Sequence, residues 1–160
     1  MEGNRVSESS VIMTQVMTPQ DANTAGNVHG GVVMRLIDTV GGVVAQRHAR
    51  VNAVTASIDR LDFHYPAYIG DLLTLKASLN MVGKTSMEVG VRVEAENVIT
   101  GEVRHTASAY LTFVALSKDG KPTPVPSLIL ENETEIRRNR EAQMRREVRL
   151  REKEKERGEI

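Results

Sequence analysis

The chain has 160 residues, with 21 basic and 21 acidic side chains, no cysteine and no tryptophan. This length predicts one domain with a sizeable core, while the balanced charge and scarce aromatic residues argue against nucleic acid or an acidic membrane surface as a partner. The lack of cysteine excludes disulfides, thiolate metal sites and cysteine nucleophiles. There is no apolar signal core and no run long enough to span a membrane, so a cytoplasmic protein is expected.

The first predicted elements are a strand over residues 11–17 and a helix over residues 30–48, joined by a polar turn. At 3.6 residues per turn, one helix face is formed by Val33, Ile37, Val40, Gly41 and Val44. Val32 and Val43 fall on the opposite side, so the helix is apolar almost all round. Such a helix is expected to be buried.

From residue 51 the apolar period changes to two, which is typical of strands. Val54 and Ile58 share one parity, but Leu61 and Phe63 have the other, and this switch predicts a bulge near Asp59. Alternating strands follow over residues 73–81, 87–96 and 103–116. The short turns between them predict an antiparallel meander with one buried and one solvated face.

These elements predict an α+β fold in which a curved antiparallel sheet wraps around one long central helix. A sheet with one apolar face needs a cover, and the helix over residues 30–48 is the only core helix available to it. One sheet cannot cover a helix that is apolar on all sides. The remaining side is therefore expected to pack against a second subunit.

A proline-rich linker over residues 121–130 separates the predicted domain, residues 1–120, from a charged C-terminal helical tail over residues 131–160. The tail is rich in good helix formers and holds 10 of the 21 basic residues. Two interpretations remain open. The tail is a solvated helix laced with i,i+4 ion pairs, or one of Arg137, Arg138 and Arg140 contacts a phosphate-bearing ligand.

Asp38 is the one carboxylate of the central helix, and it lies at the margin of the apolar face. It is either an ordinary solvated residue or part of a site, because an ionised carboxylate is costly to bury unless it is paired. The following glycines, Gly41 and Gly42, each cost about 1 kcal/mol in helix propensity. That cost suggests that another backbone or a ligand approaches the helix closely.

Other motifs are weaker. Residues 83–85 read Gly-Lys-Thr like the end of a phosphate-binding loop, but the required first glycine is absent and the segment joins two strands. The four histidines show no metal-binding spacing, so no metal site is expected.

Four blocks of sequence occur in an order that resembles the hotdog-fold acyl-CoA thioesterases. They are DANTAGNVHGGVVMRLIDTVGG, RLDFHYPAYIGD, VGKTSMEVGVRVEAEN and ASAYLTFVAL. Within that family they are most similar to the cytosolic acyl-CoA hydrolases of the bacterial YciA type and the mammalian brain type. The resemblance covers about residues 8–130.

The resemblance implies an acyl-CoA thioesterase that needs no cofactor, since coenzyme A is part of its substrate and product. It implies homodimers with joined sheets, assembled as trimers of dimers. It also implies a catalytic pair formed by Asn23 of one protomer and Asp38 of its partner, at the dimer interface. An acyl-CoA-binding or sensing module without turnover is the alternative.

The residue types at Asp38, Asn23 and Gly31 suit thioester hydrolysis. Asp38 acts either as the general base on water or as a nucleophile that forms an anhydride, and Asn23 is expected to orient the water. The helix start offers free backbone N–H groups and the positive end of the helix dipole, which makes the N–H of Gly31 the candidate oxyanion donor. His29 either contacts the carbonyl or is a structural helix-entry residue.

CoA requires cations and backbone donors for its phosphates. From the blocks that border the CoA groove in the family, the candidate substrate-binding residues are His29, Gly30, Arg60, His64, Lys84, Thr85 and Ser86. Taken singly, each of the polar candidates is also compatible with an ordinary surface position.

Overall fold

The computed structural model describes residues 1–158, so the last two residues of the predicted tail lie outside the described residues. The two helices are α1 (Gly30–Ala49) and α2 (Glu133–Gly158), and the short 3-10 helices are η1 (Val6–Glu8) and η2 (Pro19–Asp21). The strands are β1 (Asn4–Arg5), β2 (Val11–Val16), β3 (Asn52–Phe63), β4 (Leu72–Val82), β5 (Ser86–Glu96), β6 (Val103–Leu116) and β7 (Leu128–Ile129).

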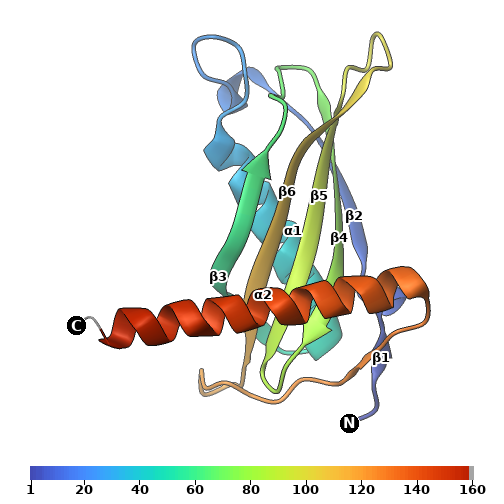
Figure 1. The fold of residues 1–160 in the computed structure, drawn as a ribbon. Coiled ribbons are helices and arrows are strands. Elements are labelled where there is room, and N and C mark those ends of the chain that lie inside the picture. The colour runs from blue at the N-terminus through green and yellow to red at the C-terminus, as the bar shows by residue number, and fades with distance from the viewer. Residues whose placement is uncertain (159–160) are drawn as a thin grey trace.

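A five-stranded antiparallel sheet in the order β2-β4-β5-β6-β3 forms the body of the molecule. The helix α1 lies against one face of this sheet, and α2 crosses the other face (Figure 1). The α+β architecture expected from the sequence is therefore present. The predicted meander corresponds to β4, β5 and β6, and β3 forms the edge of the sheet next to β6.

The core lies between α1 and the sheet. All five residues predicted to form the buried helix face are buried, from Val33 to Val44. A Cβ added at Gly41 would lie 3.0 Å from Cε2 of Phe113, which is 1% exposed on β6. Gly41 and Gly42 suggested that another group approaches the helix closely. At Gly41, that group is the ring of Phe113 on the sheet.

The edge strand β3 has two register shifts, one between Thr55 and Ser57 and one between Ile58 and Arg60. The second shift leaves Asp59 without a partner on β6, which confirms the bulge predicted from the parity switch. The first was not visible in the alternation. The two bulges bend the strand and reorient the side chains of its central segment.

The segment before α2 runs along the end of the sheet. Val125 is buried, and its N–H donates to the carbonyl of Lys84. The short strand β7 then pairs in parallel with β1 at the N-terminus. These contacts hold the proline-rich segment against the body of the molecule.

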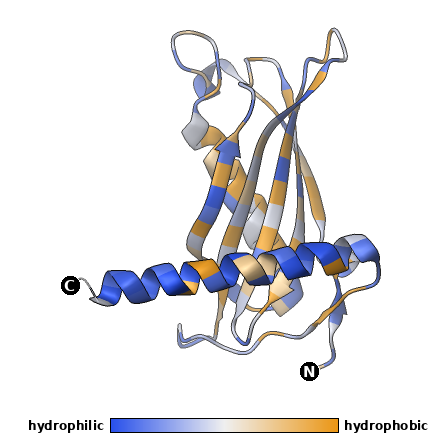
Figure 2. Cartoon of the chain, viewed as in Figure 1, coloured by the Kyte–Doolittle hydropathy of each residue, from blue (hydrophilic) through white to orange (hydrophobic). Residues whose placement is uncertain are grey.

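The charged helix α2 packs against the face of the sheet that the sequence predicted to be solvated, so that part of the prediction was wrong. Figure 2 shows α2 as mostly hydrophilic, with a few hydrophobic bands. Its contacts are accordingly polar: Arg145 makes a bidentate pair with Glu88, Nε to Oε1 and Nη2 to Oε2, both at 2.9 Å. Arg149 donates to Asp59 Oδ2 at 3.0 Å.

A polar sheet face attracts a helix through hydrogen bonds, not through apolar burial, and this explains why the apolar spacing of the tail gave no signal. Ala142 is buried under the helix, whereas Met144 and Val148 are 61% and 52% exposed. Only one i,i+4 ion pair occurs among the described residues of α2, Arg137 with Glu141 at 4.0 Å. Most described residues of α2 are exposed, as expected for a solvated helix, but the expected series of i,i+4 ion pairs along it is wrong.

Candidate active site

The polar turn before α1 is built by backbone hydrogen bonds. The N–H of Asn23 donates to the carbonyl of Asn27, and Gly26 takes a φ of +93°, a conformation that favours glycine. The N–H of His29 donates to the backbone carbonyl of Asp21, and this contact fixes the residue at which the helix begins. The turn thus positions the first residues of α1.

The first turn of α1 leaves backbone donors free. His29 is the N-cap, but its side chain makes no capping hydrogen bond. Within residues 1–158, the N–H groups of Gly30 and Gly31 have no acceptor. A Cβ added at Gly31 would meet nothing within 4 Å. Gly31 therefore offers a free donor beside open space at the positive end of a helix dipole, which suits a partial negative charge, whereas a Cβ at Gly30 would lie 3.5 Å from the ring of Phe63.

Asp38 lies two turns further along α1 and faces the edge strand β3. The hydroxyl of Thr55 on β3 donates to Asp38 Oδ1 over 2.5 Å. One carboxylate oxygen is thereby held, while no donor within residues 1–158 binds Oδ2. Thr55 was not singled out in the sequence, since a threonine in an alternating strand has no distinctive pattern and the contact depends on how β3 lies against α1.

Large apolar side chains are exposed on both α1 and the edge strand β3. On α1, Met34 and Val43 are 39% and 40% exposed, and on β3, Val54 and Ile58 are 41% and 40% exposed. Exposed apolar side chains that gather in a patch mark an interaction site in soluble proteins.

Asn23 and Asp38 are not joined within one chain. Asn23 Oδ1 accepts from the N–H of Ala25 at 2.9 Å, which leaves the amide nitrogen without an acceptor in the described part of the chain. Eight residues of helix separate Gly30 from Asp38, which is about 12 Å along the axis. Within one chain, the turn with the helix start is therefore separate from the pair of Asp38 with Thr55.

A cavity of about 330 Å³ adjoins the helix start, and Gly30 and His64 line it together with Phe63 and Thr106. The ring of His64 lies 4.6 Å from that of His105, centroid to centroid. Burial, followed by the charge of Arg92, holds the pKa of His105 below its ordinary value. Two of the predicted substrate-binding residues, Gly30 and His64, thus meet in one hollow.

The other candidates lie elsewhere. Arg60 is exposed and pairs with Asp62 at 2.6 Å. Lys84 and Thr85 lie in the turn between β4 and β5, and Ser86 begins β5, at the opposite end of the sheet from the start of α1 (Figure 1). Within one chain, these residues are not gathered around the helix start.

Two further findings concern the described residues. Among residues 1–158, no cluster of three or more His, Asp or Glu side chains is placed to hold a metal ion. Neither α1 nor α2 combines the length and apolar character needed to cross a membrane.

Comparison with known proteins gives consistent matches. A family model described as the thioesterase superfamily matches residues 25–102. The protein VdlD of Helicobacter pylori is 42% identical over 143 residues, which cover 89% of this chain and 82% of VdlD. The acyl-CoA thioester hydrolase YkhA of Bacillus subtilis is 43% identical over 129 residues, 81% of this chain and 75% of YkhA. The rat cytosolic acyl coenzyme A thioester hydrolase is 40% identical over 90% of this chain, which spans 38% of the rat protein.

Solved structures agree over nearly the whole chain. An apo-hexameric acyl-CoA thioesterase superposes with a TM-score of 0.91 at 39% identity, covering 95% of this chain and 97% of its own. An acyl-CoA hydrolase from Staphylococcus aureus, in complex with butyryl-CoA, CoA and CoA disulfide, gives 0.90 at 34% identity, covering 98% and 96%.

Three variants of the Staphylococcus aureus enzyme have also been solved, each with an alanine in place of one Asn, Asp or Thr. In that enzyme the replaced Asp lies 15 positions after the Asn, and the Thr lies 17 positions after the Asp. Asn23, Asp38 and Thr55 have the same two spacings in this chain.

Proposed function

The chain belongs to the thioesterase superfamily, and from this premise we propose that it hydrolyses fatty acyl-CoA to a free fatty acid and CoA. The observation that carries the proposal is the contact between Thr55 and Asp38, in a chain that also presents an open helix start at Gly31. The relatives named acyl-CoA thioester hydrolases, and the matched spacing of Asn23, Asp38 and Thr55, support it.

Asp38 is proposed as the general base. Thr55 holds Oδ1, so Oδ2 is free to accept a proton from water while the water oxygen bonds to the thioester carbonyl carbon. Collapse of the tetrahedral intermediate then breaks the C–S bond, and the CoA sulfur takes the proton from Asp38. Attack by Oδ2 itself, through an anhydride, uses the same geometry and is the alternative mechanism.

The backbone N–H of Gly31 is proposed as the oxyanion donor. It is free, it stands at the N-terminus of a 20-residue helix, and a substrate can approach because no side chain projects there. Loss of one such donor typically costs about 100- to 1,000-fold in rate. Asn23, whose amide nitrogen is unoccupied, is proposed to orient the attacking water.

We propose that the working site spans two protomers, with Asn23 and the helix start from one and Asp38 with Thr55 from the other. Two observations support this assignment. The half-sites are separated within one chain, and both α1 and the edge strand β3 expose large apolar side chains. A homodimer joined through the outer edge of β3 would cover apolar side chains of that strand. Assembly of such dimers into a hexamer is proposed by analogy with the hexameric thioesterases among the matched structures.

In such a dimer, the CoA portion is proposed to contact His29, Gly30, Arg60 and His64. Lys84, Thr85 and Ser86 lie at the other end of the sheet. If the two β3 edges pair through a two-fold axis perpendicular to the strands, the two protomers run in opposite directions, and that end lies toward the helix start of the partner. Those three residues are therefore proposed to serve the partner's site.

The test is thiol release from a panel of acyl-CoA esters, with wild type and Asp38→Asn compared directly. Asn preserves the shape and the oxygen that Thr55 binds, but it cannot act as the base, so a loss of about 100- to 10,000-fold is expected. Asp119→Asn, in an exposed turn, is the matched control and should retain full activity. Tight binding of the ester without thiol release by wild type would instead indicate the binding module.

The two-protomer arrangement has its own test. Inactive Asn23→Ala and Asp38→Ala proteins are mixed under conditions that exchange subunits. If the site spans protomers, each mixed dimer contains one intact site and activity returns. Mixed dimers, verified by differential tags, that stay inactive would place the whole site within one chain.

A further inference from the structure

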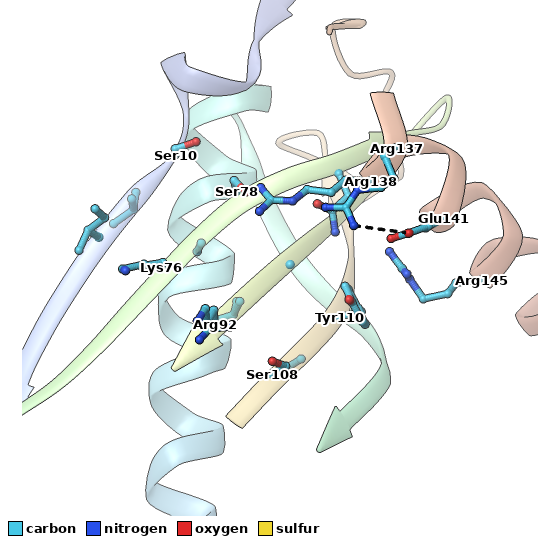
Figure 3. A pocket seen from close by; sticks show the side chains of 17 residues that line it. Ser10, Lys76, Ser78, Arg92, Ser108, Tyr110, Arg137, Arg138, Glu141 and Arg145 are labelled. Carbon is cyan, nitrogen blue, oxygen red and sulfur yellow. Dashed lines mark ion pairs between the residues drawn. The ribbon is translucent and has the colours of Figure 1, made fainter. Parts of the chain in front are cut away.

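A second hollow, of about 440 Å³, lies on the outer face of the sheet, on the opposite side from α1 and from Asp38 (Figure 3). Its volume is in the range of small-molecule sites. It forms because α2 covers only part of the outer face of the sheet, and the cross-strand pair beside the helix, Ser78 on β4 and Gly90 on β5, has small side chains. The small pair leaves a hollow between α2 and the next cross-strand pair, Lys76 with Arg92.

The wall on the sheet side carries an unfavourable arrangement of charge. Lys76 of β4 and Arg92 of β5 are direct cross-strand partners. Like charges in that position destabilise a sheet. One carboxylate serves both cations, since Glu94 Oε1 accepts from Lys76 Nζ at 3.1 Å and from Arg92 Nε at 3.0 Å. This wall thus keeps an excess of positive charge.

The opposite wall belongs to α2. Arg137, Arg138 and Arg145 line the hollow from this side (Figure 3). Arg137 and Arg145 have carboxylate partners in Glu141 and Glu88, whereas Arg138 has none within ion-pair distance among residues 1–158.

The cations of the hollow outnumber their carboxylate partners. Five cations, Lys76, Arg92, Arg137, Arg138 and Arg145, line it, and the partners recorded for them are three carboxylates, Glu88, Glu94 and Glu141. Serine hydroxyls, including that of Ser78, add neutral donors. Two facing cationic walls over a floor of small side chains match the requirements of phosphate groups, which bind Arg and Lys through charge-assisted hydrogen bonds.

We propose that this hollow binds a phosphate-bearing small molecule, held between Lys76 and Arg92 of the sheet and Arg138 of α2. Because α2 supplies one wall, the ligand also links the helix to the sheet. The phosphates come either from a free diphosphate-bearing molecule or from CoA, and both sources present the same chemistry to the five cations. The site is independent of the hydrolytic chemistry, since none of its residues is part of the half-sites on the α1 side.

The test is calorimetric titration of the full chain with inorganic pyrophosphate at low ionic strength, in the absence of any acyl group. Lys76→Gln and Arg138→Gln should each weaken binding about tenfold, which is the effect of losing one charge-assisted contact. Arg140→Gln is the matched control, because Arg140 is an exposed arginine of the same helix that does not line the hollow. Glu94→Gln should tighten binding, since it releases both sheet cations.

A second titration, with CoA present at saturation, identifies the source. If CoA leaves pyrophosphate binding unchanged, the site belongs to a separate ligand. If CoA displaces pyrophosphate from wild type and this competition is lost in Arg138→Gln, the phosphates belong to CoA. Both results support a phosphate site. Absence of binding up to about 1 mM pyrophosphate, or equal binding by wild type and Arg138→Gln, would overturn the proposal. Circular dichroism of each variant checks that the fold is unchanged. Thioester hydrolysis does not bear on this test, so a normal hydrolysis rate would not count in favour of the phosphate site.

Discussion

Replacement of Thr55 by valine tests how the carboxylate of Asp38 is positioned. Valine keeps the branched shape of threonine and exchanges the hydroxyl for a methyl group, so only the 2.5 Å hydrogen bond to Asp38 Oδ1 is removed. A hydrogen bond to a charged group contributes about 1.5–3 kcal/mol. If this energy keeps Oδ2 directed at water, the kcat of Thr55→Val should fall about 10- to 100-fold.

The assay is steady-state thiol release, with kcat and KM determined separately. Because Thr55 orients a catalytic group and does not touch the CoA portion in the proposed site, KM should change less than about twofold. Thr55→Ser is the matched control, since it restores the hydroxyl while removing the methyl group, and it should recover most of kcat. Thr55 is exposed in the single chain, so the melting temperature should shift by only about 1–2 °C.

A Thr55→Val enzyme with a kcat within twofold of wild type would refute the positioning role. Equal losses in the serine and valine variants would refute it as well, because the hydroxyl would then not be the group that matters. Light scattering of each variant checks that the assembly is unchanged, since β3 is an exposed edge.

Three further predictions concern stability. Arg145→Met should lower the melting temperature by about 6–20 °C, because removing one partner of a buried ion pair costs about 3–5 kcal/mol and Glu88 is only 2% exposed. Adding Glu88→Gln to this variant should recover much of the lost stability. If the effects of the two substitutions on stability were simply additive in a double-mutant cycle, the prediction would be contradicted. Gly42→Ala should raise the melting temperature by gaining up to about 1 kcal/mol of helix propensity, since its Cβ would lie 3.7 Å from the nearest ring atom, whereas Gly41→Ala, at 3.0 Å, should lower it. The hydrogen bonds from Lys76 and Arg92 hold the pKa of Glu94 below its ordinary value of 4.5. The ionised Glu94 carboxylate therefore contributes stability above pH 4.5, and this contribution is lost as the pH falls through the lowered pKa. The difference in melting temperature between wild type and Glu94→Gln should shrink over that pH range, and a difference independent of pH would exclude the effect.

The attachment of α2 also explains a feature of Arg145. Burial lowers the pKa of its guanidinium, but the hydrogen bonds and the charge of Glu88 outweigh burial and raise the pKa overall. The same guanidinium lies 3.7 Å over the ring of Tyr110. Arg145 therefore stays charged, and its guanidinium holds α2 to the sheet through Glu88 and the ring of Tyr110 together.

The sequence by itself determined the main helices and strands and the faces that form the core between α1 and the sheet. Periods of 3.6 and of two are local properties of the chain, and they predicted α1, the meander of β4, β5 and β6, and the bulge at Asp59. The turn and helix start with Asn23 and Gly31, and the lone carboxylate of Asp38, were also readable, because each is unusual for its position.

Only the tertiary structure decided which distant residues meet. Thr55 reaches Asp38 because β3 lies beside α1, and α2 docks through Arg145 and Arg149 because Glu88 and Asp59 face outward on the sheet. The pairing of Lys76 with Arg92 depends in the same way on the register of two strands. Such contacts join residues far apart in the chain and follow from strand pairing and helix docking, whereas local periodicity reports only which side of one element is buried.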